Sequence, residues 1–337
     1  MTARWFRFLA AFAGVTAAYR WERRRSERAV SEDPEWSELQ REIHSTPVDV
    51  TSIDGTRLHA EVFGPNDAPT IILVHGWCCS LRFWHYQLKD LVHAFRIVAY
   101  DLRGHGRSDR SRTGDYSTDV LAADLDAVVR ACVPPGEQVV VVGHSMGGMS
   151  IVAWAAAHPG EVPHRLAGVV LVDTGMSELI VRSRLGPRIS GLSAIRTATG
   201  RLLLSIPLPL PAPPDPIVTR LVRYVALSNK ARPAHVWFCT QMVVDCSPVV
   251  RAACGTTLAR LDLTECLPSL TVPTVVLVGD DDVLTPPAQS QLIAASVPGS
   301  RLFHILSAGH MSPVEKHEEV TRHIRTIADR TLLGADP

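Results

Sequence analysis

The sequence lacks the motifs that hold metals and nucleotides in many enzymes. Its 337 residues contain no H-E-x-x-H pair for zinc, no EF-hand loop, no Walker lysine motif and no G-x-G-x-x-G after a predicted strand. It also has no excess of charge of either sign, because 34 basic residues balance 34 acidic ones. A nucleic-acid-binding domain usually carries a basic surplus. We therefore predict no metal, no cofactor and no nucleic-acid partner.

Cysteines are few and poorly placed for cross-links. There are seven, an odd number, with no C-x-x-C pair, and Cys78 and Cys79 are adjacent, which is unfavourable for a mutual disulfide. With 46% hydrophobic and 20% charged residues, the composition is that of a globular protein. We predict reduced, mostly buried cysteines in a cytoplasmic protein.

The N-terminal apolar segment, from Phe8 to Tyr19, is shorter than the roughly 20 residues that a membrane-spanning helix needs. Arginines follow it and no clean cleavage site is present, which disfavours secretion. On a helix, five apolar side chains of this region would share one face: Trp5, Phe8, Leu9, Phe12 and Tyr19. Such a stripe among arginines predicts either peripheral membrane contact through residues 5–28 or packing against the protein itself or a partner.

The rest of the chain alternates between predicted strands and helices. This alternation predicts an α/β fold, with a mostly parallel central sheet covered by helices on both faces. Between residues 175 and 265 the strands stop, and helical segments surround a proline-rich stretch at 207–216. We predict an N-terminal segment and linker over 1–46, a core over 47–175 and 266–337, and a helical insertion over 176–265.

The stretch 139–150, VVVVGHSMGGMS, is the most informative part of the sequence. Four consecutive valines predict a strand buried on both faces, and an apolar helix follows the pattern G-x-S-x-G. Between such a strand and helix this pattern is typical of a nucleophile elbow, a sharp turn that exposes a serine hydroxyl. Gly143 and Gly147 would be needed because a Cβ atom would crowd the turn. The candidate nucleophile is therefore Ser145.

Other short motifs follow the other predicted strands. In chain order they are HGW at 75–77, DLRGHG at 101–106, GHSMGG at 143–148, GDDD at 279–282 and GH at 309–310. In this order the motifs resemble those of the α/β-hydrolase family over about residues 48–333. The resemblance implies an α/β-hydrolase fold with a helical cap, here the insertion, and a serine hydrolase of the esterase or lipase kind.

The resemblance also implies a catalytic triad in the order serine, aspartate, histidine. His310 is then the base that activates Ser145. Similar sequences carry the acid third after a glycine, which selects Asp282, while Asp281 and Asp173 stay open as competitors. The oxyanion hole would use the backbone N–H groups of two further residues. These are Trp77 and Met146.

We predict hydrolysis of a small-molecule carboxylic ester, with a lipid as one option. Apolar residues of the predicted cap are candidates for substrate contact, although they could equally form the cap's own core. They are Trp237, Phe238 and Met242. A thioesterase, a C–C bond hydrolase or a cofactor-free haloperoxidase would use the same triad. A non-catalytic binding protein of this fold is less compatible, because all three triad positions are filled.

Overall fold

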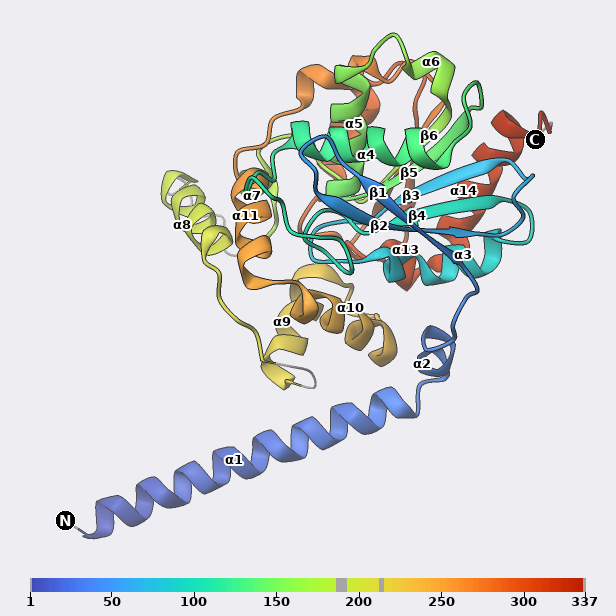
Figure 1. Ribbon diagram of the computed structural model, residues 1–337. Coiled ribbons are helices and arrows are strands. Elements are labelled where there is room, and N and C mark those ends of the chain that lie inside the picture. The colour runs from blue at the N-terminus through green and yellow to red at the C-terminus, as the bar shows by residue number, and fades with distance from the viewer. Residues whose placement is uncertain (1, 186–192, 212–214, 336–337) are drawn as a thin grey trace.

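The computed structural model describes residues 2–185, 193–211 and 215–335, with the backbone alone for 2–13, 15, 193 and 194. Its centre is an eight-stranded sheet with the strand order β1-β2-β4-β3-β5-β6-β7-β8 (Figure 1). The strands are β1 (Thr46–Thr51), β2 (Arg57–Phe63), β3 (Thr70–Val74), β4 (Arg96–Tyr100), β5 (Val139–His144), β6 (Leu166–Val172), β7 (Thr274–Gly279) and β8 (Arg301–Ile305). The pairs β1–β2 and β2–β4 are antiparallel and all other pairs are parallel. The predicted α/β class with a mostly parallel sheet is confirmed.

Helices cover both faces of this sheet. Helices α4 and α5 pack in one apolar cluster, and α3 and α14 pack in a second cluster on the opposite face (Figure 1). Valines of β5 alternate between the two clusters, which explains why this strand is a continuous apolar run. The covering elements are η1 (Leu81–Trp84), α3 (His85–Leu91), α4 (Thr118–Cys132), α5 (Met146–Ala157), α6 (Val162–Arg165), η2 (Thr264–Ser269), α12 (Pro287–Ser296), α13 (Ser312–Glu315) and α14 (His317–Leu332).

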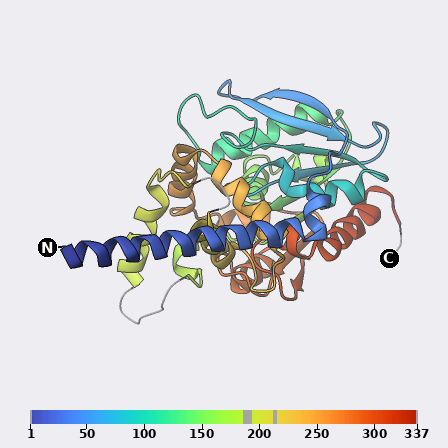
Figure 2. The ribbon, with the colours of Figure 1, turned by 90° about the horizontal axis from the view of Figure 1, so that it is seen from below.

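The chain begins with one long helix, α1 (Thr2–Ser31), followed by the short α2 (Pro34–Leu39). Figures 1 and 2 show that the N-terminal end of α1 extends beyond the rest of the molecule. Among the described residues, no helix combines the length and the apolar character that crossing a membrane requires. The predicted stripe of Trp5, Phe8, Leu9 and Phe12 lies outside the described side chains.

The segment between β6 and β7 is helical in the described residues. It contains α7 (Leu179–Arg182), α8 (Ser193–Ser205), α9 (Pro216–Ala226), α10 (Pro233–Asp245) and α11 (Pro248–Leu258). Helix α7 is a single turn, and α8 lies before the proline-rich stretch at 207–216. A proline begins α9, α10 and α11, because a missing N–H costs nothing at the first position of a helix.

These inserted helices contact the loops that follow three strands. The Trp77 indole after β3 donates a hydrogen bond to the Arg251 carbonyl at 3.2 Å. A Cβ atom on Gly104, after β4, would lie 2.8 Å from the Val250 side chain. A Cβ atom on Gly309, after β8, would lie 2.6 Å from the Leu227 backbone. The helices therefore lie over the edge of the sheet where the parallel strands end.

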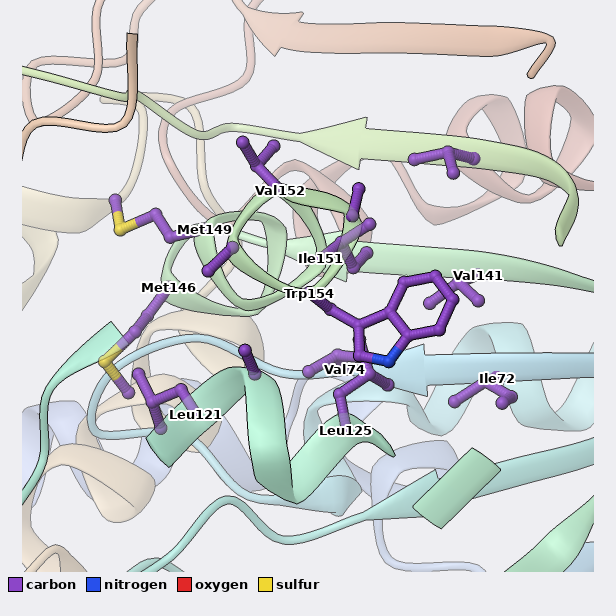
Figure 3. Close-up of a cluster of buried hydrophobic side chains, with 14 of the residues drawn as sticks. Ile72, Val74, Leu121, Leu125, Val141, Met146, Met149, Ile151, Val152 and Trp154 are labelled. Carbon is purple, nitrogen blue, oxygen red and sulfur yellow. The ribbon is translucent and has the colours of Figure 1, made fainter. Parts of the chain in front are cut away.

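A buried apolar cluster anchors α5 beneath that edge (Figure 3). Trp154 of α5 lies among Leu125 of α4 and Val141 of β5, and is almost completely buried. Its indole N–H, at the rim of the cluster, donates to the Asp126 carboxylate at 3.2 Å. A buried tryptophan of this kind fixes a helix firmly, because it removes a large apolar area from water. The first residue of α5 is consequently held against the end of β5.

Candidate active site

Ser145 stands at a sharp turn between β5 and α5. Its backbone has a positive φ of 51°, which a non-glycine residue adopts only under constraint. A Cβ atom on Gly147 would lie 2.2 Å from the Val74 carbonyl oxygen, and one on Gly143 would lie 2.6 Å from the Gly147 backbone. Both distances are shorter than any real Cβ contact. The G-x-S-x-G spacing thus matches the space that the turn leaves.

Three side chains from three separate loops form one hydrogen-bonded chain at this turn. The Ser145 Oγ lies 3.0 Å from His310 Nε2, and His310 Nδ1 lies 2.8 Å from Asp282 Oδ2. All three residues are buried. With the proton on Nδ1 shared with Asp282, Nε2 is free to accept the hydroxyl proton of Ser145. The structure thus brings together the three residues that were predicted as a triad.

Electrostatics at these positions favour a charged aspartate beside the histidine. Burial alone lowers the pKa of His310, but the Asp282 carboxylate outweighs burial and raises this pKa above its ordinary value. Burial raises the pKa of Asp282, yet His310 and hydrogen bonds from Thr285 lower it overall. The imidazole is therefore a stronger proton acceptor than a free histidine.

The two competing aspartates are placed differently. Asp281 is exposed at the turn after β7. Asp173, after β6, is buried and accepts hydrogen bonds from the Gly279 N–H at 2.8 Å and the Ser312 hydroxyl at 2.6 Å. Burial and the nearby Asp282 charge raise the pKa of Asp173 to about 8, despite these donors. Only Asp282 is hydrogen-bonded to His310, so geometry favours it among the three.

The loop after β3 lies against the nucleophile. A Cβ atom on Gly76 would lie 2.9 Å from the Cβ of Ser145, so Trp77 begins within reach of an acyl group on the serine. Met146 is the first residue of α5, where N–H groups have no partner within the helix. In the described part of the chain, the Trp77 N–H also donates to no acceptor. These two N–H groups suit an oxyanion hole.

Three buried histidines brace this loop and the loop that carries His310. His75 donates from Nδ1 to the Gly76 carbonyl at 2.7 Å and accepts at Nε2 from the Leu102 N–H at 2.9 Å. His105 Nε2 accepts from the Cys78 N–H at 3.2 Å. His144 donates from Nε2 to the His310 carbonyl at 2.8 Å, and burial lowers its pKa to about 3. A neutral His144 adds no positive charge beside the proposed base.

Two supporting residues were given no role from the sequence. Thr285 donates from its hydroxyl to Asp282 Oδ2 at 2.8 Å and lies 3.1 Å from His310 Nδ1. Glu315 accepts from the Gly309 N–H and from the Ser228 N–H, both at 2.8 Å. Glu315 thereby joins the loop that carries His310 to the segment that follows α9. The Thr-Pro pair at 285–286 was a usable signal for Thr285, whereas nothing in the sequence marks Glu315.

The predicted substrate contacts are divided between two environments. Phe238 and Met242 are buried in the same cluster as Phe83, whose ring centre lies 4.4 Å from that of His144. Trp237 points instead to α2, where its ring meets Trp36 edge-on with 6.3 Å between centres. Their role in substrate binding stays a prediction.

Known proteins share both the sequence pattern and the fold. A family model described as alpha/beta hydrolase fold matches residues 69–187. The chain is 30% identical over 255 residues to a non-heme chloroperoxidase of Streptomyces lividans, covering 73% of this chain and 87% of that one. It is 27% identical to a proline iminopeptidase of Pestalotiopsis fici, covering 83% of this chain and 98% of that one.

Solved structures of other proteins share this fold. A thermophilic esterase from Thermogutta terrifontis superposes with a TM-score of 0.65 at 28% identity, covering 83% of this chain and 97% of that chain. The similarity therefore extends over nearly the whole of these proteins and includes the core strands. The chain is an enzyme of the alpha/beta hydrolase fold family.

Proposed function

We propose that the protein hydrolyses carboxylic esters through an acyl-enzyme on Ser145. The observation that carries the proposal is the continuous hydrogen-bonded chain from Ser145 through His310 to Asp282. His310 takes the serine proton while Oγ attacks the ester carbonyl, and then gives that proton to the departing alcohol. Water activated by His310 then attacks the acyl-enzyme and releases the acid. The esterase of Thermogutta terrifontis supports this choice of substrate class.

The N–H groups of Trp77 and Met146 would hold the oxyanion of each tetrahedral intermediate. Removing one such donor typically costs about 3 kcal/mol of transition-state stabilisation. We further propose that the inserted helices α7–α11 act as a cap that shapes the acyl pocket. Buried Phe238 and Met242, close to His144 through Phe83, support an apolar, lipid-like acyl chain.

Ser145→Ala tests the proposal directly. We expect turnover of p-nitrophenyl esters to fall by about 10⁶-fold, because the remaining triad cannot form an acyl-enzyme. A fluorophosphonate probe should label the natural protein and not this variant. Ser150→Ala is a matched control, because Ser150 is a buried serine of α5 whose hydroxyl, among the residues that the structure describes, bonds only to the helix carbonyl of Met146. Retained turnover in Ser145→Ala would exclude the mechanism, and a chain-length optimum at acetate would exclude the lipid-like acyl group.

One alternative reaction has a specific observation behind it. The relative from Streptomyces lividans is a non-heme chloroperoxidase. In the same site, hydrogen peroxide instead of water would attack the acyl-enzyme and give a peracid. Measuring peracid formation from acetate and hydrogen peroxide, beside ester hydrolysis, separates the two activities. Thioester and C–C bond substrates belong in the same screen, since the triad would serve them equally.

A further inference from the structure

Helix α9 carries apolar side chains on two opposite faces. Val218 and Val222 are buried against the protein, as an amphipathic helix requires. Ile217, Leu221 and Tyr224 lie one helical turn apart on the other face and are 70%, 55% and 63% exposed. Three large apolar residues in this register form a continuous exposed strip, which is unusual for a protein surface in contact only with water.

Other inserted segments and α1 also expose large apolar side chains. Helix α8 and the segment after it expose five, and the described side chains of α1 include two: Ile195, Leu202, Leu203, Ile206, Leu208, Tyr19 and Trp21. Ile217, Leu221 and Tyr224 of α9, with Trp21 of α1, a helix that contacts α9, are called the apolar face below. Elsewhere on the described surface outside the inserted helices and α1, large exposed apolar side chains are isolated. They are Ile53, Leu306 and Leu333.

Polar contacts hold α1 against α9. The Tyr19 hydroxyl donates to Asp215 Oδ2 at 2.7 Å, and Arg220 of α9 forms an ion pair with Glu22 of α1. Figure 2 shows α1 crossing the side of the molecule where the inserted helices lie. A ligand of the apolar face would therefore meet α1 and α9 as one fixed unit.

The charge of this region is strongly positive. Helix α1 contains seven arginines and two glutamates, and the chain from 179 to 226 contains seven arginines and one acidic residue, Asp215. Because the whole chain is neutral, this charge is concentrated here. Arg20, Arg24 and Arg28 are exposed, and within the described residues no carboxylate pairs with them. Unpaired arginines beside exposed apolar groups suit a surface that offers negative charge and a hydrocarbon layer together.

We propose that the apolar face docks on a lipid bilayer containing anionic lipids, with α9 inserted into the interface and the α1 arginines on the headgroups. A second copy of the chain is a poorer occupant, because two copies of this face would oppose positive charge with positive charge. The proposal extends the membrane contact predicted for residues 5–28 to the inserted helices. It does not depend on the hydrolytic reaction, because the face lies outside the triad.

Vesicle co-sedimentation of the full chain tests this docking. The probes are vesicles of phosphatidylcholine alone and of phosphatidylcholine mixed with phosphatidylglycerol. We expect binding to the mixed vesicles that weakens as salt rises, since salt screens exposed charges. The triple substitution I217S/L221S/Y224S should lower the partition coefficient at least about tenfold, because three apolar side chains no longer leave water. A natural chain that stays in the supernatant with mixed vesicles would overturn the proposal.

The matched control is I53S/L306S, which removes apolar side chains of comparable exposure from other parts of the surface. It should bind like the natural protein, and equal losses in both variants would overturn the assignment to this face. R24Q/R28Q alters only exposed charges and should weaken binding to the mixed vesicles more than binding to phosphatidylcholine alone. This second variant also keeps the test decisive if the triple variant fails to fold. Self-association that the triple substitution abolishes, without vesicle binding, would assign the face to a second copy instead.

Discussion

The edge where the parallel strands end and the apolar face depart in opposite ways from the usual arrangement, in which polar residues are exposed and apolar residues are buried. At the edge, polar groups such as Asp282, His310 and Asp173 are buried, and each has a hydrogen-bond partner. On the apolar face, Leu221 and Tyr224 are exposed to solvent. Buried polar groups are costly unless partners are provided, and exposed apolar patches are costly to solubility. Each departure is the basis of one proposal: catalysis at the edge of the sheet and docking on a lipid surface at the apolar face.

The two regions also differ in how many close contacts constrain each residue. At the edge, one missing donor or one extra Cβ atom disturbs several contacts, as the position of Gly76 against Ser145 shows. On the apolar face, exposed side chains contact little else in the protein. Substitutions should therefore reduce activity by orders of magnitude at the edge and change folding stability very little on the face.

After Ser145→Ala, Asp282→Asn is expected to have the largest effect. It should lower kcat by about 10⁴-fold, because the amide no longer stabilises the His310 imidazolium and favours the wrong tautomer. The pH profile supplies a second readout. His310 must be neutral to act, so activity appears above its pKa, which Asp282 raises. Removing that charge should move the rise in activity to lower pH, measured as kcat/KM for a p-nitrophenyl ester.

Asp173→Asn is the matched comparison. Asp173 is as buried as Asp282 and follows β6, the strand that pairs with β7 in the sheet. Its carboxyl contacts Gly279 and Ser312 but not His310, so we expect less than about a tenfold loss of kcat. A reversed order of the two variants would show that Asp173 is the acid of the triad.

The site residues at the edge of the sheet were largely predictable, because they belong to short contiguous sequence motifs. The turn at Ser145 needs glycines at fixed spacings, and the strand before it is a run of valines. His310 and Asp282 each follow a predicted strand, and the ends of parallel strands meet at one edge. Local sequence therefore determined which side chains would converge.

The inserted helices and α1 were less predictable because their positions depend on distant contacts. Tyr19 meets Asp215 across 196 residues of chain, and Trp36 meets Trp237 across a similar separation. Helix α8 contains Gly200 and exposes apolar residues such as Leu203, so its pattern does not show the usual buried stripe. Contacts of this kind leave no periodic signal in a single sequence.

Glu315→Gln probes the junction between the two regions and should have an intermediate effect. Each carboxylate oxygen accepts one N–H, from Gly309 and from Ser228, whereas glutamine offers one acceptor and one amino group. One buried N–H would then lack a partner, which costs about 1–3 kcal/mol. Urea unfolding measures this loss. Glu319→Gln is the control, since Glu319 forms only an exposed pair with Arg322, and equal midpoints in the two variants would contradict the junction.

The smallest expected effect concerns the stability of the two faces of α9. I217S, L221S and Y224S should each change the free energy of unfolding by no more than about 0.5 kcal/mol, because these side chains are exposed in both the folded and the unfolded state. V218A and V222A, on the buried face, should each cost about 1–3 kcal/mol through lost packing. Thermal and urea unfolding without lipid measure both sets. Large losses from the exposed set would show that these residues pack within the protein, and the apolar face would then be part of its core.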